Sequence, residues 1–236
     1  MNSRNRFKWR HIKSEIILLN VHWYLKYPLS YRNLEEMMLE RGLKVDHSTI
    51  GRWVLTYSPE IEKRTRRYLK ATNDSWRVDE TYIRVNGEWK YLYRAVDSEG
   101  NTLDFMLSAL RNKEAAKRFF KKVLKRKQNK QPRVINVDKD KAYPPATEKL
   151  KEEKILDNDS ELRQVKYLNN RIEQDHRGVK KITNAGLGYQ SFHTAWRTIR
   201  GIETMQMIRK GQIENVSKGD SVSEKEFVES LFGIAA

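Results

Sequence analysis

Two aspartates occupy positions in the sequence where an acidic side chain is unexpected. Asp79 lies inside WRVDETYIRV (76–85), a strand-like run of β-branched and aromatic residues, where Asp is depleted because it resists burial. Asp138 directly follows the apolar run VINV, and a parallel strand would deliver it to the functional edge of a sheet. Taken alone, each Asp is more often a turn former or a salt-bridge partner. In neighbouring strands of a mixed sheet, the two carboxylates would lie close together.

A third carboxylate lies in KYLNNRIEQDHRGVKKI (166–182). If residues 168–182 are helical, one apolar stripe faces the core, formed by Leu168, Ile172, Val179 and Ile182. At about 100° per residue, Arg177 lies roughly 40° and Lys180 roughly −20° from Glu173, so these three share a face. Asp175 points to the opposite side. The shared face offers a carboxylate for a metal and two cations for phosphates, and the alternative is a solvated salt-bridge face.

Three converging carboxylates fit metal-dependent phosphodiester cleavage. Two divalent cations about 4 Å apart can stabilise the attacking and leaving oxygens of an in-line displacement. Mg²⁺ takes oxygen ligands and keeps several waters, so two Asp and one Glu suffice without a covalent nucleophile. The sequence therefore predicts Asp79, Asp138 and Glu173 as catalytic metal ligands for two Mg²⁺ ions, for which Mn²⁺ could substitute.

Two other side chains near these carboxylates leave alternatives open. Asp140 is a local rival of Asp138, although the end of the strand favours Asp138. His176 lies one turn beyond Glu173 and is either a contact to the site or a surface or packing residue. The five histidines are scattered, without the close pairing expected of a zinc site.

The elements that would position the carboxylates are strands followed by helices. Three strand-like runs, 76–85, 88–97 and 102–110, are separated by turn residues, and Asn86-Gly87 is a strong hairpin signal. A helix over 113–127, a buried strand ending at Asp138 and a helix over 145–153 follow. This order describes a mixed sheet covered by helices, the α/β order of RNase H-like domains. Residues 191–212 form an amphipathic helix, expected to pack onto the sheet.

The first part of the chain reads as three helices. The first ends near Pro28, the second runs from Ser30 to Gly42, and the third is capped by Asp46 or Ser48 and ends at Pro59. The last two, joined by a tight turn, predict a helix-turn-helix that presents Ser48, Thr49, Gly51 and Arg52 to DNA. An ordinary three-helix bundle is the alternative. Gly51 either weakens the helix, by about 1 kcal/mol, or lets DNA approach closely.

The composition favours a polyanionic partner. The chain of 236 residues carries 47 Lys+Arg against 31 Asp+Glu, a formal charge of +16. It has no cysteine, which excludes disulfides, thiolate zinc sites and thiol nucleophiles. No apolar run approaches the roughly 18 residues of a spanning helix, and the N-terminus does not read as a signal peptide. We therefore expect a cytoplasmic protein.

These stretches together resemble the bacterial insertion-sequence transposases of family six, a branch of the DDE transposases. The resemblance covers residues 7–213 and includes SYRNLEEMMLERGLKVDHSTIGRWV, WRVDETYIRVNGEWKYLYRAVDSEG, RVINVDKDKAYPPA and KYLNNRIEQDHRGVKKI. The 34 residues between Asp138 and Glu173, and Lys180 seven residues after Glu173, both fit the family.

The resemblance implies a domain order and a function. It implies a helix-turn-helix domain (1–62), a basic linker (63–75), an RNase H-like catalytic domain with a mixed five-stranded sheet (76–213) and a C-terminal tail (214–236). It makes Asp79, Asp138 and Glu173 the metal-binding triad and Lys180 a contact to DNA. It further implies terminal inverted repeats as the substrate, a homo-oligomer that pairs two ends, cointegrate formation and association with the bacterial nucleoid. A non-catalytic DNA-binding regulator and a nuclease of the same fold are the alternatives.

Overall fold

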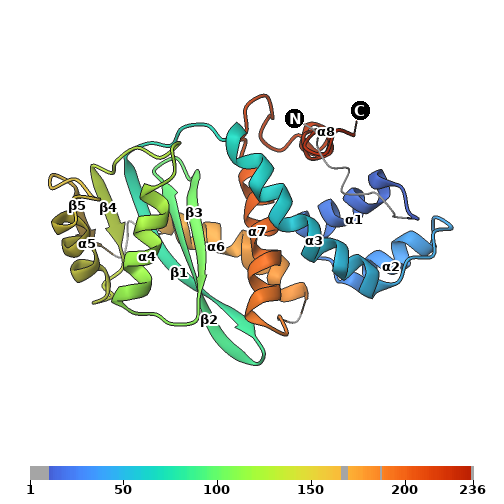
Figure 1. Cartoon of the computed structure of the whole chain (residues 1–236), viewed down its shortest axis with the longest axis horizontal. Helices are drawn as coiled ribbons and strands as arrows, with labels where there is room; N and C mark the ends of the chain where they lie inside the picture. The colour runs from blue at the N-terminus through green and yellow to red at the C-terminus, as the bar shows by residue number, and fades with distance from the viewer. Residues whose placement is uncertain (1–10, 166–169, 187, 235–236) are drawn as a thin grey trace.

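The computed structural model describes residues 11–165, 170–186 and 188–234. A sheet with helices on both faces lies at one end of the molecule, and a group of helices lies at the other (Figure 1). The strands are β1 (Ser75–Val85), β2 (Glu88–Asp97), β3 (Thr102–Ser108), β4 (Val134–Val137) and β5 (Glu161–Gln164). The helices are α1 (Ser14–Lys26), α2 (Tyr31–Leu39), α3 (His47–Thr65), the 3₁₀ turn η1 (Arg66–Tyr68), α4 (Lys113–Leu124), α5 (Tyr143–Glu152), α6 (Asn170–Ala185), α7 (Phe192–Arg209) and α8 (Ser221–Ser230).

The sheet has the order β3-β2-β1-β4-β5. β1 and β2 pair antiparallel, as do β2 and β3, whereas β4 and β5 join in parallel. Asn86 and Gly87 both have positive φ, as a two-residue hairpin turn with the right twist requires. The predicted RNase H-like, mixed five-stranded sheet is therefore confirmed, although β5 itself carried no recognisable sequence pattern.

Each face of the sheet is covered by a hydrophobic core. On one face, α4 and α5 pack on β1, β2 and β4 through residues such as Trp76, Phe119 and Tyr143. On the other face, Ile83 and Phe105 belong to a core that also contains residues of α1, α3, α6 and α7. The helical end of the molecule therefore shares a continuous core with the sheet. α7 lies along α3 and also contacts β3, which makes it the element that joins the two ends.

The prediction that Pro59 ends the third helix is wrong, because α3 continues to Thr65 with Pro59 inside it. A proline cannot donate the hydrogen bond to the carbonyl four residues earlier, here that of Leu55. Arg197 of α7 supplies the missing donor, since its Nε lies 2.7 Å from the Leu55 oxygen. A tertiary contact thus replaces the lost helical bond, and residues 63–65 of the expected linker belong to the helix.

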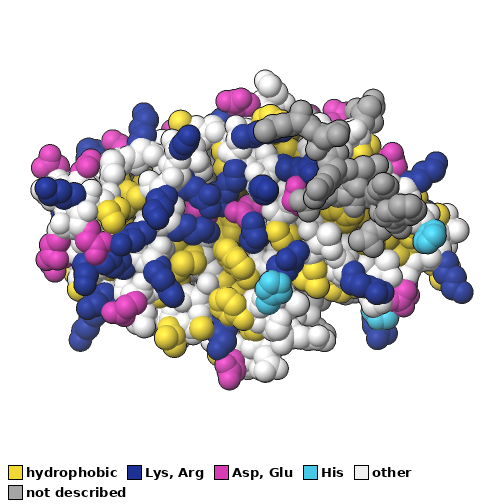
Figure 2. All heavy atoms as spheres, in the orientation of Figure 1, with side chains coloured by type: hydrophobic (Ala, Val, Ile, Leu, Met, Phe, Trp, Pro, Cys, Tyr) yellow, Lys and Arg dark blue, Asp and Glu magenta, His cyan; other side chains and the backbone are white. Residues whose placement is uncertain are grey.

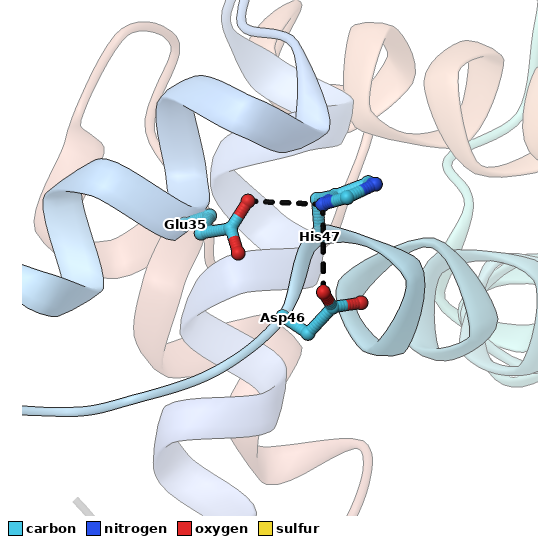
Figure 3. A group of neighbouring side chains, drawn as sticks. All are labelled: Glu35, Asp46 and His47. Atoms are coloured by element: carbon cyan, nitrogen blue, oxygen red, sulfur yellow. Dashed lines mark hydrogen bonds and ion pairs between the residues drawn. The ribbon is translucent and has the colours of Figure 1, made fainter.

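The connection between α2 and α3 is held by a small polar group, drawn in Figure 3. Asp46 caps α3, and its carboxylate accepts a hydrogen bond of 2.8 Å from the backbone N–H of Ser48. His47 Nδ1 lies 3.0 Å from Glu35 of α2 and 3.6 Å from Asp46. These contacts fix the start of α3 against α2.

Gly51 does not face outward as expected, because it is buried against the ring of Tyr31. A Cβ added there would lie 3.3 Å from the nearest ring carbon. The glycine therefore serves the packing of α2 on α3, and the Tyr31 ring in turn stacks on Tyr24 of α1 at 4.3 Å between centroids.

Residues 214–236, expected as a tail, contain α8, which packs on α1 and α7. Lys26 of α1 and Glu224 of α8 form an ion pair of 2.7 Å with both side chains almost fully buried. Val228 and Leu231 belong to the core of the helical end. Among the described helices, none combines the length and apolar character that crossing a membrane requires.

Candidate active site

β1 and β4 bring the two predicted aspartates to the same level of the sheet. The parallel pairing matches Ser75 with Val134 and Arg77 with Asn136. Continued by two residues, the same register sets Asp79 opposite Asp138, which directly follows the last residue of β4. The two residues are therefore neighbours across the sheet, at the point where β4 has ended and β1 continues into the hairpin.

Three carboxylates meet at this point. Asp79, Asp138 and Glu80 each offer an oxygen, and these oxygens all lie within 4.8 Å of one another. Burial, together with the negative charges of Glu80, Asp138 and Glu173, raises the pKa of Asp79 to about 7. A pKa raised this far shows that the negative charge of Asp79 is not balanced by nearby positive charge, which is common at functional sites.

Glu173 lies in the first turn of α6 and is exposed to solvent. Its charge contributes to the raised pKa of Asp79, so this carboxylate lies within electrostatic reach of the β1–β4 pair. Ile172, Val179 and Ile182 are buried as predicted, whereas Leu168 lies outside the described residues. The structure therefore places α6 with its apolar stripe inward and Glu173 outward.

The segment that carries these carboxylates matches a known protein family. A family model described as a DDE domain, of the IS240 transposase type, matches residues 73–212. Over 206 residues the chain is 39% identical to the transposase for the insertion sequence-like element IS431mec of Staphylococcus aureus, which spans 87% of this chain and 89% of that protein. The chain belongs to the DDE transposases of insertion-sequence family six.

Two further proteins resemble the transposase. One is the transposase for insertion sequence element IS257 in transposon Tn4003 of Staphylococcus aureus, 38% identical over 206 residues, or 87% of this chain and 89% of that protein. The other is the integrase catalytic core domain of HTLV-2 in complex with magnesium, with 16% identity and a TM-score of 0.34. That similarity covers 49% of this chain and 83% of the integrase chain.

The carboxylate group fits the divalent metal that DDE transposases use. All of its oxygens come from Asp and Glu, the hard ligands that Mg²⁺ and Mn²⁺ prefer, and no His or Cys of the described residues joins this group. The raised pKa of Asp79 is consistent with a site whose negative charge a cation would balance.

A buried ionic network lies on the strand next to Asp79. Arg94 of β2 lies opposite Asp79 in the strand register and is fully buried. Its guanidinium binds both carboxylate oxygens of Glu203 in α7, at 2.7 and 2.9 Å, and also Asp175 of α6 at 2.7 Å. Lys210 completes the network at 2.6 Å from Asp175. Asp175 therefore faces the interior, as its position on the helix predicted, and ties α6 and α7 to the sheet.

Three residues around the carboxylates were not among the predicted site residues: Glu80, Arg111 and Tyr143. Arg111, in the connection from β3 to α4, forms ion pairs with Glu80, with Asp138 at 3.2 Å and with Asp140 at 2.9 Å. The Tyr143 hydroxyl donates a hydrogen bond to Glu80. Only Glu80 carried a signal, as an acid within a strand next to Asp79, whereas Arg111 reaches the site through a connection whose path no pattern specified.

The two open alternatives near the triad have structural answers. Both aspartates accept a backbone N–H two residues on, Asp138 that of Asp140 at 3.0 Å and Asp140 that of Ala142 at 2.6 Å. Asp140 is not part of the group that unites Asp79, Glu80 and Asp138. His176 is buried, and its Nε2 lies 3.8 Å from an Asp79 oxygen, so it is both a packing residue and a neighbour of the site. Burial, followed by the charge of Arg94, lowers the pKa of His176 to about 3.

The predicted DNA contacts of α3 lie away from the carboxylates. The start of α3 lies on the far side of α7 from the sheet (Figure 1). Ser48 and Arg52 are exposed, and the Arg52 guanidinium donates to the hydroxyls of Ser48 and Thr49 at 3.2 Å. On α6, Arg177 is exposed and Lys180 is half-buried. Lys and Arg side chains also gather over α4 and the adjoining sheet (Figure 2).

Proposed function

We propose that this transposase binds the terminal inverted repeats of an insertion sequence, cleaves the DNA at the element ends and transfers the 3′-hydroxyl ends to target DNA. The observation that carries the proposal is the meeting of Asp79 and Asp138 at the end of β4, within electrostatic reach of Glu173. Retention of Asp79, Glu80 and Asp138 at one point, with the pKa of Asp79 raised to about 7, is unfavourable for folding alone and is explained by a role in catalysis.

In this proposal Asp79, Asp138 and Glu173 hold two Mg²⁺ ions, for which Mn²⁺ substitutes. When bound, the cations supply positive charge to the attacking and leaving oxygens of the displacement. Arg94, which is the strand neighbour of Asp79 on β2, joins that strand to α7 and α6 through its buried pairs with Glu203 and Asp175. Neutral His176, next to Asp79, adds no positive charge that would compete for the carboxylate.

Two surfaces of the chain bind DNA in this proposal. Arg177 and Lys180 follow Glu173 on the same helix and contact the phosphates near the cleaved bond. Ser48, Thr49 and Arg52 at the start of α3 read the terminal repeat as part of a helix-turn-helix. The net charge of +16 supports contact with a long polyanion. Because two element ends must be paired, we propose that the chain acts as a homo-oligomer and forms cointegrates.

The test is an assay with the full chain and the DNA that borders its reading frame. Labelled duplexes carrying those borders are incubated with Mg²⁺ or Mn²⁺ together with an unlabelled target plasmid. We expect metal-dependent cleavage at the borders and labelled joint molecules. Cleavage without joint molecules would identify a nuclease, and binding without cleavage would identify a regulator.

A further inference from the structure

The β1–β2 hairpin exposes two large aromatic side chains. Trp89 is 61% exposed and Tyr82 is 45% exposed. The Tyr82 ring meets the Trp89 ring edge-on at 6.2 Å between centroids and the Tyr91 ring at 5.5 Å. The three rings support one another, so the tryptophan is held at the surface as part of an ordered aromatic group.

A cavity of about 350 Å³ lies beside these rings, lined by Tyr82, Trp89, Lys180 and Asn184. We call it the aromatic groove. A second cavity of about 220 Å³ shares Trp89 and Asn184 with it and adds Arg84. The groove thus runs between the hairpin and the second half of α6, with aromatic faces, an amide and cationic groups in its walls.

Both walls of the aromatic groove lead back to the carboxylates. Tyr82 follows Asp79 by three residues of β1, a distance of about 10 Å along a strand. Lys180 follows Glu173 by seven residues of α6, again about 10 Å along a helix. Stacked nucleotides of one strand advance by about 3.4 Å, so the groove lies a few nucleotides from a phosphate held at the carboxylates.

The chemistry of the groove fits one occupant. An aromatic face offers stacking to any nucleobase, and a lysine beside it can bind the phosphate of the same nucleotide. A base paired inside a duplex has both faces covered by its neighbours, so only a base that has left the stack can use the tryptophan. The Asn184 side chain carries both a donor and an acceptor for the edge of such a base.

We propose that the aromatic groove binds an unpaired base of the DNA strand held in the active site, stacked on Trp89 with the backbone phosphate at Lys180. The inference rests on the proposed function, since it needs a DNA strand at Asp79, Asp138 and Glu173. It assigns to Trp89 and Tyr82 a binding role in positioning the strand end, separate from the metal-holding carboxylates.

The test removes a nucleobase from the DNA probe in one arm and the Trp89 ring from the protein in the other. The probe is a duplex of the bordering DNA with a single-stranded 3′ extension, and each nucleotide near the junction is replaced in turn by an abasic site. Binding to the full chain is measured by fluorescence anisotropy. We expect one abasic position to weaken wild-type binding about tenfold, and Trp89→Ala to weaken binding of the intact probe by a similar factor. The combination of both changes should give no further loss.

Matched variants separate stacking from other roles. Trp89→Phe should keep most of the affinity, because it retains an aromatic face, and Trp89→Ala should leave the salt dependence of binding unchanged. Lys180→Ala should instead reduce the slope of log K against log salt concentration by about one, as expected for a lost phosphate contact. Val222→Ala, which truncates an equally exposed apolar side chain in α8, should leave binding unaltered.

Three outcomes would overturn the inference. Additive effects of Trp89→Ala and every abasic position would show that no base contacts the ring. A loss of thermal stability in Trp89→Ala that matches its loss of binding would make the residue structural. A change in molar mass of DNA-free Trp89→Ala would identify the groove as a contact between copies of the chain. In each case the proposed function would still stand if the wild-type protein cleaved the DNA that borders its reading frame. If the wild-type protein did not cleave this DNA, the proposed function itself would be wrong.

Discussion

Two regions of the transposase gather three potential metal-ligating side chains within the same distance. One is the group of Asp79 and Glu80 in the middle of β1 with Asp138 at the end of β4, and the other is the group of Glu35, Asp46 and His47 between α2 and α3. In both, one ligand atom from each residue lies within 4.8 Å of the others. Proximity alone does not distinguish them.

Their partners distinguish them. In the α2–α3 group, Asp46 caps a helix and Glu35 contacts His47, so each acid already stabilises the fold. In the β1–β4 group, burial and like charges raise the pKa of Asp79 to about 7, while the ion pairs of Arg111 go to Glu80, Asp138 and Asp140. The difference lies in Asp79, and it teaches that a buried acid with a strongly raised pKa marks function better than closeness of acids does.

Substitution of Asp79, Asp138 or Glu173 should have the largest effect on DNA cleavage, and it should differ most clearly from substitution of Glu35 in the α2–α3 group. Asp79→Asn, Asp138→Asn and Glu173→Gln should each lower border cleavage on the order of 10³-fold or more, because each removes a carboxylate from cations that stabilise charge in the displacement. Glu35→Gln should retain cleavage. Rates are measured on labelled border duplexes at saturating Mg²⁺, with DNA binding followed by gel shift as the control for folding.

Retained Mg²⁺-dependent cleavage in any one triad variant would contradict the assignment of that carboxylate as a catalytic metal ligand. A second contrary result would be a Glu35→Gln variant that binds DNA normally but no longer cleaves. The first result would remove that carboxylate from the catalytic set, and the second would assign a catalytic role to the α2–α3 group.

The ionic network next to Asp79 should matter nearly as much for stability. Glu203→Gln should lower the free energy of unfolding by about 3–5 kcal/mol, because it removes one partner of a fully buried pair and leaves Arg94 under-compensated. Glu161→Gln is the control, since its single ion pair with Arg163, of 2.6 Å, lies at the surface and its loss should leave the free energy of unfolding nearly unchanged. Urea unfolding of both variants measures the difference, and equal effects would contradict the structural role of the network.

The pH dependence of stability offers a third contrast. The pKa of Asp79 is raised from 3.8 to about 7, so the folded protein binds a proton that the unfolded chain has already released in that range. The metal-free protein should therefore lose about 2–4 kcal/mol of stability through Asp79 as the pH rises from about 4 to about 7. Asp79→Asn should flatten this part of the profile, whereas Glu35→Gln should not. An unchanged profile in Asp79→Asn would show that the charge of Asp79 is compensated.

Much of the sheet could be predicted because its signals are local. Aromatic and β-branched runs, the Asn86-Gly87 turn and two acids in strand positions located β1–β4 and the Asp79–Asp138 pair. The features that could not be predicted depend on distant partners. Pro59 stays inside α3 because Arg197, far along the chain, supplies a hydrogen bond.

The rest of the site shows the same limit. Glu80 could have been noticed as a second acid in β1, but successive side chains of a strand point to opposite faces of the sheet, so the pattern predicts that Glu80 faces away from Asp79. It reaches the other oxygens where β4 has ended, together with Arg111 from a connection whose path the sequence does not specify. β5 has no apolar alternation because most of its side chains are exposed, and the role of Gly51 becomes clear only from the Tyr31 ring beside it.

The smallest expected effect tests the other half of the comparison, the assignment of Asp46 as a helix cap. Asp46→Ala removes the acceptor of the Ser48 N–H and should lower the melting temperature, because the first turn of α3 loses its cap. Asp46→Asn keeps an acceptor oxygen and should recover most of that loss, although it removes the negative charge. The stabilisation that Mg²⁺ gives to the protein, measured as the shift in melting temperature, should be the same in both variants and in wild type. If Asp46→Asn were instead as unstable as Asp46→Ala and lost the Mg²⁺ response, the carboxylate would act through its charge on a cation, and the α2–α3 group would be a metal site after all.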